Sequence, residues 1–447
     1  MVIFRRIILA FIIVLLGLSI AANVKAQSPR IDVLTVKGTV NPVLVDYIQR
    51  GIENAEDTGA EAVIIQMDTP GGLDDSTRKI IQHIVNSRVP VVVYVAPSGA
   101  RAASAGLYIL QSAHVAAMSP NTATGAATPI SLGEEGEAQI SEELQAKIIN
   151  DSAAYMRSLA ESHGRNADWA EKAVREAVSV TEQEALELNV IDMVAPNLES
   201  LIQQLDGRQV NMLGGTTVTL HTAGAVTNEV EMKTIERFLY TIADPNIAYL
   251  LLSIASLGIM VEIFNPGLIF PGIIGAISGI LAFYSLGQLP VNIAGILLIV
   301  LAFGLFIGEV LTTSFGLFTM GGLVSLIAGS LILFQGAESP VFRIDPWLIA
   351  VVVIGITGAA SFLVQRAISA HRRQAKTGRE ELIGKTATVR ETLNPEGTVF
   401  YRGERWAAHS QGGEIKKGEQ VVIDRIDGLM LYVSKAETNG QQENITR

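Results

Sequence analysis

The sequence predicts an α/β domain, a bundle of membrane-spanning helices and a small all-β barrel, in that order along the chain. Residues 27–235 alternate unbroken apolar strands with helices, which is typical of a layered domain with buried parallel strands. Residues 247–365 are almost free of charge, as membrane-spanning helices require. Residues 383–435 contain short β-rich stretches separated by turn residues, which predicts the barrel.

The composition fits a membrane protein with more than one domain. The chain has 447 residues, of which only 17% are charged, and its mean hydropathy of +0.36 is too high for an ordinary soluble enzyme. The net charge of −11 argues against a general nucleic-acid binder. The absence of cysteine excludes disulfides, thiolate zinc sites and cysteine nucleophiles. No motif implies a metal or an organic cofactor, so we expect none.

The N-terminus reads as an export signal. Arg5 and Arg6 precede an apolar stretch at 7–20, and the small-residue sequence "VKA" ends at Ala26. We therefore expect residues 1–26 to be a signal peptide. The apolar stretch is also long enough to serve as an uncleaved anchor, and under either interpretation the following domain lies outside the cytoplasm.

The second apolar region predicts about five membrane crossings. Each predicted segment is close to the roughly 20 residues that cross a bilayer. The segments are 247–264, 268–286, 292–311, 316–335 and 347–365. An odd number of crossings places the C-terminal barrel on the side opposite the exported domain. Residues 366–379 carry five Lys or Arg and no acid, which indicates a cytoplasmic flank. The sequence thus predicts a multi-pass protein of the cell (inner) membrane.

Two carboxylates in this region, Glu262 and Glu309, allow two interpretations. A carboxylate among membrane helices can mark an ion or proton path. Both residues, however, stand at predicted helix ends, beside "FNPG" and "VLTTSFG", where a carboxylate at the level of the headgroups is easily accommodated.

The α/β domain is predicted element by element from its apolar runs. Its strands are too uniformly apolar for a sheet with one face in water, so helices are expected to cover both faces. The predicted elements are strand 31–36, helix 42–57, strand 62–67, helix 74–87, strand 89–96, a short helix from about Ala102 and strand 114–119.

Two glycine-bearing turns follow strands of this domain, where ligands gather in parallel α/β folds. In the first, "DTPGGL" at 68–73, Gly71 and Gly72 expose backbone N–H groups that could stabilise an oxyanion. The alternative is a plain tight turn that enters a helix capped by one of the next polar residues, Asp74, Asp75 or Ser76.

The second turn, "APSGARAASAGLYIL" at 96–110, contains the candidate nucleophile Ser104. This serine would begin a helix whose next amide, that of Ala105, can also point at an oxyanion. The small residues around it allow either a neighbouring element or a substrate to come close. A serine among alanines can equally be a packing residue, and the G-x-S-x-G motif is absent.

Lys147 is the candidate base for this serine. It lies beside the apolar stripe of Ile140, Leu144, Ile148 and Tyr155 on a predicted helix. An ammonium group held against an apolar face is desolvated and loses its proton more easily, which suits a general base. The alternative is a lysine whose tip reaches water. The histidines have no obvious companion carboxylate and are expected to be structural or on the surface; they are His83, His114 and His163.

The C-terminal part predicts a closed or nearly closed barrel of the OB type. Its five expected strands are Thr386–Arg390, Thr398–Tyr401, Glu404–His409, Gln420–Asp424 and Met430–Ser434. Residues 383–435 contain eight Lys or Arg and seven Asp or Glu. This near balance of charge does not predict the positively charged groove that binds nucleic acid. We therefore expect a protein-contact module, followed by a disordered tail at 436–447.

Taken together, "DTPGG", "AASAG" and "KIINDSAAYMRSLA" strongly resemble the NfeD-type membrane-bound serine proteases, which are relatives of the Clp protease and of signal peptide peptidase A. The resemblance covers the whole chain. It implies a crotonase/Clp-like fold for the first domain, with Ser104 as nucleophile and Lys147 as general base of a Ser–Lys dyad. It also implies an oxyanion hole from the backbone of Gly71, Gly72 and Ala105. A Clp-type triad is not matched, because "GAATPISLG" holds no histidine.

The resemblance also carries expectations about substrate and partners. It implies a stomatin-like (SPFH) membrane protein as partner and an apolar segment as the site of cleavage. Crotonase-like domains commonly self-associate, so a homo-oligomer of two or more copies is expected. The polar insert 131–143 is expected to be a mobile loop over the site, and Arg101 to face either a substrate or an acidic partner.

Three classes of function remain open at this point. The first is a membrane-anchored serine endopeptidase. The second is a non-proteolytic scaffold that binds a stomatin-like partner. The third is a crotonase-type acyl-CoA enzyme, although an export signal would separate the domain from cytosolic CoA thioesters.

Overall fold

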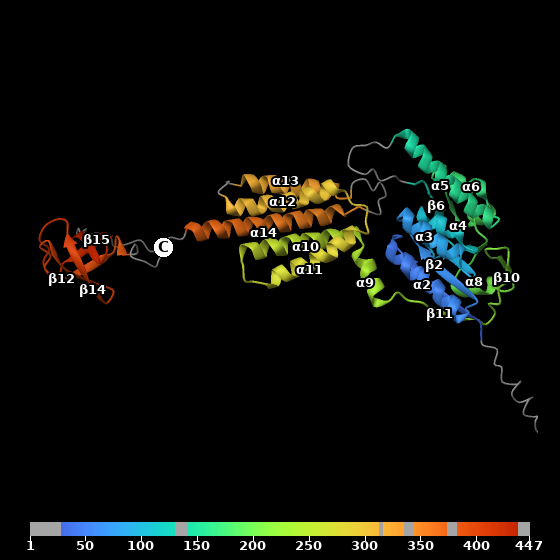
Figure 1. The fold of residues 1–447 in the computed structure, drawn as a ribbon, viewed down its shortest axis with the longest axis horizontal. Helices are drawn as coiled ribbons and strands as arrows, with labels where there is room; N and C mark the ends of the chain where they lie inside the picture. Colours follow the sequence, from blue (N-terminus) through green and yellow to red (C-terminus); the bar gives the residue numbers. More distant parts are fainter. Residues whose placement is uncertain (1–27, 130–140, 313–315, 335–342, 373–381, 437–447) are drawn as a thin grey trace, which may run out of the picture. The chain divides into compact units, whose positions relative to one another are not determined.

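The computed structural model describes residues 28–129, 141–312, 316–334, 343–372 and 382–436 (Figure 1). The chain divides into two compact units, Met1–Ala360 and Ser361–Arg447. The predicted signal peptide and the predicted disordered tail from residue 437 onwards lie outside the described residues, as does most of the insert 131–143.

A six-stranded, fully parallel sheet forms the centre of the α/β domain and confirms the predicted fold class. Its strand order is β11-β1-β2-β3-β5-β8. The strands are β1 (Arg30–Lys37), β2 (Ala62–Asp68), β3 (Val91–Val95), β5 (Val115–Met118), β8 (Met193–Val194) and β11 (Val226–Glu229). Every residue of β3 is buried, which explains its uninterrupted apolar sequence.

Helices cover both faces of this sheet and create two apolar cores. One core lies between the sheet and several helices, among them α2 (Pro42–Thr58), α3 (Asp74–Val85) and α4 (Ala105–Ser112). The other is closed by α8 (Leu198–Leu205) and by the hairpin of β9 (Gln209–Asn211) and β10 (Thr217–Thr219). Local signals set the helix limits: the side chain of Asn41 caps the start of α2, and Gly59 ends it in the left-handed conformation.

A second, smaller sheet positions the chain at Ser104. It consists of β4 (Arg101–Ala103), β6 (Ala123–Gly125) and β7 (Ser179–Thr181). The prediction of a helix from about Ala102 was wrong by three residues, because residues 101–103 pair with β6 and α4 begins only at Ala105.

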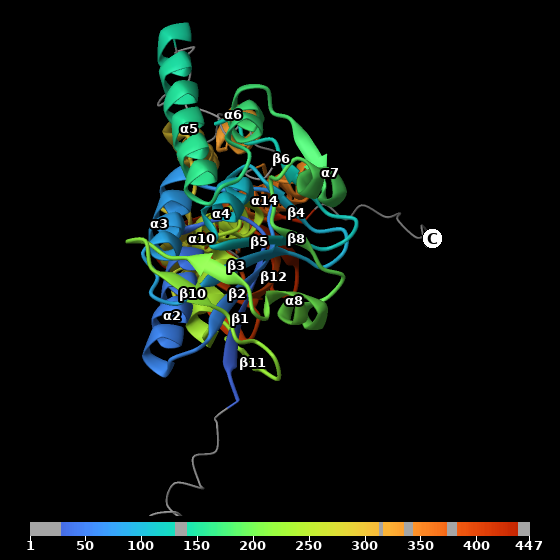
Figure 2. The same cartoon turned by 90° about the vertical axis from the view of Figure 1, so that its right-hand side faces the viewer.

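Three further helices complete the α/β domain: α5 (Glu142–Ser162), α6 (Ala167–Arg175) and α7 (Glu182–Glu187). Residues 141–147 are all exposed, and the buried side of α5 begins only at Ser152. Figure 2 shows the N-terminal turns of α5 extending away from the rest of the domain.

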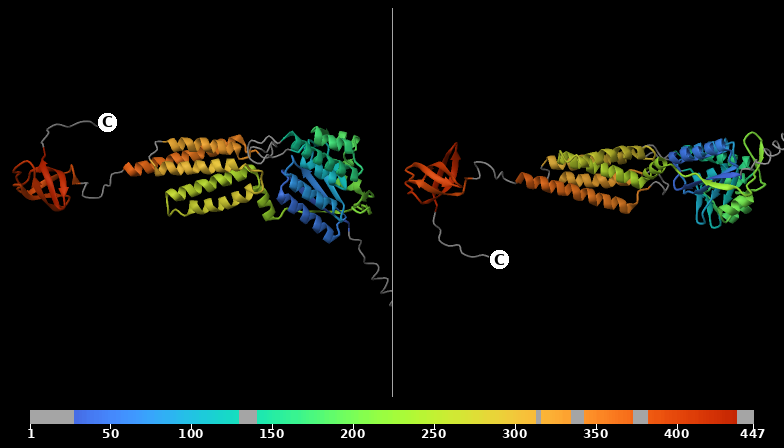
Figure 3. Two further views of the ribbon diagram at one scale, coloured as in Figure 1. Left: turned by 45° about the horizontal axis from the view of Figure 1, so that its top comes forward. Right: turned by 90° about the horizontal axis from the view of Figure 1, so that it is seen from below.

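After α9 (Thr234–Ile242), the five predicted apolar segments form helices that lie side by side (Figure 3). They are α10 (Pro245–Phe264), α11 (Phe270–Leu286), α12 (Ile293–Leu311), α13 (Leu317–Ile332) and α14 (Pro346–Arg372). Within the described residues, α10 and α12 are long and apolar enough to cross a membrane, and three apolar stretches are shorter. Five crossings therefore remain a prediction.

Small residues allow the bundle helices to pair closely. A side chain at Gly258 of α10 would collide with Gly275 of α11, and one at Gly329 of α13 would collide with Ile299 of α12. The carboxylate of Glu309 accepts hydrogen bonds from the N–H groups of Gly316 and Thr319, at 2.8 and 3.0 Å, and so caps α13. This geometry supports the interpretation of Glu309 as a helix-end carboxylate.

The second unit ends in a closed five-stranded barrel, as the sequence predicts. Its order β12-β13-β14-β16-β15, with a parallel β14–β16 pair among antiparallel ones, matches an OB-type barrel. The strands are β12 (Thr386–Glu391), β13 (Glu396–Tyr401), β14 (Glu404–Ser410), β15 (Gln420–Asp427) and β16 (Met430–Lys435). Closure leaves no free edge in the barrel.

Candidate active site

Ser104 occupies a strained turn between β4 and α4. Its φ of 52° and ψ of −115° lie in a region that side chains rarely adopt. The turn is held on both sides, because the Ser104 N–H donates to the Gly125 carbonyl at 3.0 Å and the Ser104 carbonyl accepts from the Leu107 N–H at 3.0 Å. The hydroxyl of Ser104 is half-buried and makes no hydrogen bond within the described part of the chain. A serine with a strained backbone, directly before a helix, and with a hydroxyl that has no hydrogen-bond partner in the described structure is suited to nucleophilic attack.

The Gly71–Gly72 turn lies directly beside this serine. A Cβ atom on Gly71 would lie 2.9 Å from the Ser104 Cβ and 3.3 Å from its Oγ, and the φ of Gly71 is +122°. A Cβ atom on Gly72 would overlap the backbone of Val40. Gly71 therefore requires glycine for conformation and for space, and Gly72 requires it for space.

Two backbone N–H groups near Ser104 are available for an oxyanion. Among the described residues, the amides of Gly72 and Ala105 donate no hydrogen bond, and they come from the two different turns. The N–H of Gly71, in contrast, already donates to the Oγ1 of Thr69 at 3.1 Å. Of the three predicted donors, two are thus free in this structure.

Thr69 fixes both of these turns, and the sequence analysis did not identify it. Its fully buried hydroxyl also donates to the Gly71 carbonyl, at 3.2 Å. Its backbone pairs with β4: the Thr69 N–H donates to the Arg101 carbonyl at 2.8 Å, and the Ala103 N–H donates to the Thr69 carbonyl at 3.1 Å. Its methyl group lies where a side chain on Gly106 would be. The only sequence signal was its position between a buried strand and "PGG".

Most of the small residues around Ser104 serve packing within the domain. Ala100, Ala102 and Ala105 are buried, so neighbouring elements, rather than a substrate, fill the space around them. Arg101 is exposed, and its N–H donates to the Asp68 carboxylate at 3.1 Å.

The structure does not bring Lys147 to Ser104. Lys147 is exposed on the projecting first turns of α5, and no hydrogen bond joins the two residues in the described structure. The expected burial of Lys147 against an apolar stripe is therefore wrong here, because that part of the stripe is uncovered and Leu144 is 48% exposed. A hydrogen bond joins α5 to α4 further along, where the Tyr108 hydroxyl donates to the Ser152 carbonyl at 3.3 Å.

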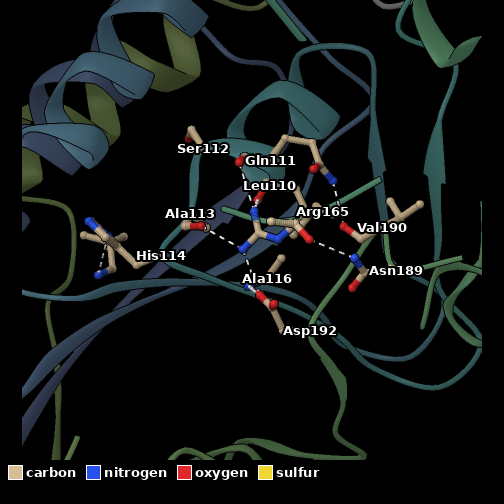
Figure 4. Close-up of polar contacts among 12 residues, drawn as sticks. Leu110, Gln111, Ser112, Ala113, His114, Ala116, Arg165, Asn189, Val190 and Asp192 are labelled. Atoms are coloured by element: carbon tan, nitrogen blue, oxygen red, sulfur yellow. Dashed lines mark hydrogen bonds and ion pairs between the residues drawn. The ribbon is translucent and has the colours of Figure 1, made fainter. Parts of the chain in front are cut away.

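A buried ion pair holds the other end of α4 (Figure 4). Arg165 is almost fully buried and donates to the Gln111 and Ala113 carbonyls at 2.9 and 2.8 Å. It also contacts Asp192 at 2.8 Å, whose carboxylate accepts from the Ala116 N–H at 2.7 Å. A cation is favourable at the C-terminus of a helix, so this pair anchors the helix that begins at the serine.

Two histidines lie near this ion pair and have structural roles. The Nδ1 of His114 accepts from the Val91 N–H at 3.1 Å, and the two imidazole rings are 5.9 Å apart. Burial, followed by the nearby charge of Arg165, lowers the pKa of His114 and of His163 to about 4. Both rings are therefore neutral at pH 7. His83 is a partly exposed residue of α3.

The Thr69→Val substitution tests whether the hydroxyl holds the glycine turn. Removing the hydroxyl leaves the Gly71 N–H without a partner in a buried place, so we expect a loss of about 1–3 kcal/mol in the free energy of unfolding. Thr69→Ser keeps the hydroxyl and should recover most of that loss. Urea unfolding of residues 28–242, which contain both apolar cores and the whole of α9, measures the difference. Equal losses in both variants would contradict this role.

The buried histidines predict that the domain loses stability in mild acid. Their pKa is near 6.5 when unfolded and about 4 when folded, so the unfolded chain binds more protons as the pH falls. The free energy of unfolding should be highest above about pH 6.5 and should fall towards pH 4, by on the order of 3 kcal/mol per histidine. His163→Gln should flatten this decline. His221→Gln, at an exposed position, is the control and should leave it unchanged.

Comparison with known proteins gives three family matches that together span most of the chain. Residues 30–207 match the NfeD1b N-terminal domain, residues 246–366 match the NfeD integral membrane domain, and residues 379–435 match the NfeD-like C-terminal, partner-binding domain.

Relatives extend over the full length of the chain. The membrane-bound protease PH1510 of Pyrococcus horikoshii is 39% identical over 98% of this chain and 100% of its own. The membrane protein NfeD1b of Bacillus subtilis is 27% identical over 95% of this chain and 96% of its own. Among solved structures, 1510-N, a membrane protease specific for a stomatin homolog from Pyrococcus horikoshii, is 34% identical, with a TM-score of 0.43, over 49% of this chain and 100% of its own. The chain belongs to the NfeD family of membrane proteins.

Proposed function

We propose that this protein is a membrane-anchored serine endopeptidase that uses a Ser104–Lys147 dyad. The observation that carries the proposal is the strained Ser104, with its hydroxyl unengaged and the free N–H groups of Gly72 and Ala105 in the two adjoining turns. The full-length relative named a membrane-bound protease supports the same reaction class.

The proposed reaction proceeds through an acyl-enzyme. The Ser104 Oγ attacks the peptide carbonyl carbon while neutral Lys147 takes its proton, and the N–H groups of Gly72 and Ala105 bind the resulting oxyanion. Collapse of this intermediate breaks the C–N bond, and the Lys147 ammonium returns the proton to the leaving amine. Water, deprotonated by Lys147, then attacks the ester, and the second product leaves with the free serine restored.

The mechanism requires the first turns of α5 to approach Ser104. In the structure these turns project into solvent, with Leu144 48% exposed, so the dyad is not yet assembled. We infer that bound substrate, a second copy of the chain, or both cover this exposed half of α5. A homo-oligomer of two or more copies would bury Leu144 and reduce the freedom of Lys147. The insert 131–143 leads directly into this helix.

The substrate and the location follow from the family and from the charges. We propose apolar segments of membrane-associated proteins as substrates and a stomatin-like (SPFH) protein as partner, recruited by the barrel that matches a partner-binding domain. The protein is membrane-bound, and the basic flank at 366–379 supports a cytoplasmic barrel and an extracytoplasmic protease domain.

The dyad predicts a specific set of variants and a pH profile. Cleavage of an apolar peptide should fall by about 10³-fold or more in Ser104→Ala and in Lys147→Ala. Wild-type activity should rise with pH, because a lysine acts as a general base only in its neutral form. Lys147→Arg should also be inactive, since its guanidinium stays charged. Lys172→Ala, another exposed lysine of the same domain, is the matched control and should keep full activity.

A non-proteolytic scaffold is the second candidate, favoured by the exposure of Lys147 away from Ser104. A scaffold predicts no turnover by the full-length protein, even with a stomatin-like partner added, together with partner binding that Ser104→Ala leaves intact. Turnover that both dyad substitutions abolish excludes this candidate. Turnover that neither substitution affects would contradict the dyad.

A further inference from the structure

The short helix α9 presents an apolar edge that the described structure leaves about half exposed. Ile235 is 58% exposed and Phe238 is 46% exposed. They are three residues apart and therefore lie on the same side of the helix. The remaining exposed positions of α9 are polar: Thr234, Arg237 and Thr241. The helix is thus amphipathic along its exposed surface.

The opposite side of α9 is fixed to the α/β domain. Glu236 accepts two hydrogen bonds from the guanidinium of Arg50, at 2.7 and 2.8 Å. The Tyr240 hydroxyl donates to the Lys37 carbonyl at 2.8 Å and approaches the Thr39 carbonyl at 3.3 Å. These contacts hold α9 in one orientation, so the apolar edge cannot turn inward to bury itself.

The chain also fixes how far α9 can be from the bilayer. Only Ala243 and Asp244 separate it from α10, one of the helices long enough to cross a membrane, and the Asp244 carboxylate caps that helix. In addition, the Ser285 hydroxyl of α11 donates to the Ile242 carbonyl at the end of α9. A nine-residue helix is about 14 Å long, so all of α9 lies within reach of the bilayer surface.

We propose that α9 lies in the interfacial layer of the bilayer, with Ile235 and Phe238 inserted between the lipid chains. An amphipathic helix with a polar outer side and an apolar edge is the form that binds this layer. Lipid is the occupant that the chain itself brings to this position, because α10 enters the bilayer directly after α9. The α/β domain is then held at the membrane by two attachments, the spanning helix α10 and the apolar edge of α9.

This position has a consequence for the proposed active site. Gly38 leaves room for the Tyr240 hydroxyl, and Val40, two residues further, pairs with the glycine turn: its N–H donates to the Gly71 carbonyl and its carbonyl accepts from the Leu73 N–H, both at 2.9 Å. Tyr240 of a lipid-bound α9 therefore contacts residues 37–40, the segment that pairs with this turn. If the proposed function holds, the substrates are segments presented at the bilayer surface. The lipid contact of α9 does not depend on the proposed function.

The absence of cysteine in the chain allows a direct test. Ile235→Cys, Phe238→Cys and the control Arg237→Cys are each labelled with the polarity-sensitive fluorophore NBD in the full-length protein. Arg237 is exposed and its ion pair with Glu231 is exposed as well, so its loss should leave the fold intact. The proteins are placed in phosphatidylcholine–phosphatidylglycerol vesicles, with or without lipid that carries a shallow doxyl quencher.

We expect blue-shifted emission at 235 and 238, with doxyl quenching at least about threefold stronger than at 237. Equal, weak quenching at all three positions would place α9 in water and overturn the proposal. A blue shift without quenching, together with cysteine cross-linking between copies at 235 or 238, would assign the edge to a second copy and also overturn it. Neither readout depends on proteolysis, so failure of the proposed function would leave this result unaffected.

Discussion

The pairing of Thr69 with β4 is the contact on which the rest of the candidate site depends. Two turns that lie more than thirty residues apart in the sequence must place their backbone N–H groups around one serine. Thr69 does this with its backbone, which hydrogen-bonds to Arg101 and Ala103, and with its hydroxyl, which holds Gly71. Because all these bonds are buried, little water competes with them, and the two turns are held as one unit.

The fold was largely predictable because the sequence patterns that define it are local. Apolar runs bounded by turn residues located the central strands, and the barrel strands were found within a few residues. The start of α4 was misplaced because pairing of residues 101–103 with β6 is a long-range contact that overrides the local preference for helix. Arg165 was missed for the same reason: its partners on α4 and at Asp192 are distant in sequence.

The error at Lys147 shows a limit of helical periodicity. The spacing of Leu144, Ile148 and Tyr155 correctly indicated an amphipathic helix, and Tyr155 does pack against the domain core. Periodicity identifies which side of a helix is apolar, but not how much of that side another element covers. The covered part of α5 starts at Ser152, five residues after Lys147, which leaves the lysine more than one turn outside the folded core.

The two halves of the proposed dyad therefore stand on elements of very different rigidity. Ser104 directly precedes a helix whose far end is anchored by the buried Arg165–Asp192 pair, and its own turn is hydrogen-bonded on both sides. Lys147 stands on an uncovered helix end, where few contacts resist movement. Under the proposed mechanism, the fold already holds the nucleophile and the oxyanion donors in place, and only the proposed base, Lys147, has to approach. In the proposed mechanism, covering the start of α5 brings Lys147 to Ser104, so a molecule that binds there would control the proposed proteolysis without any change in the rest of the site.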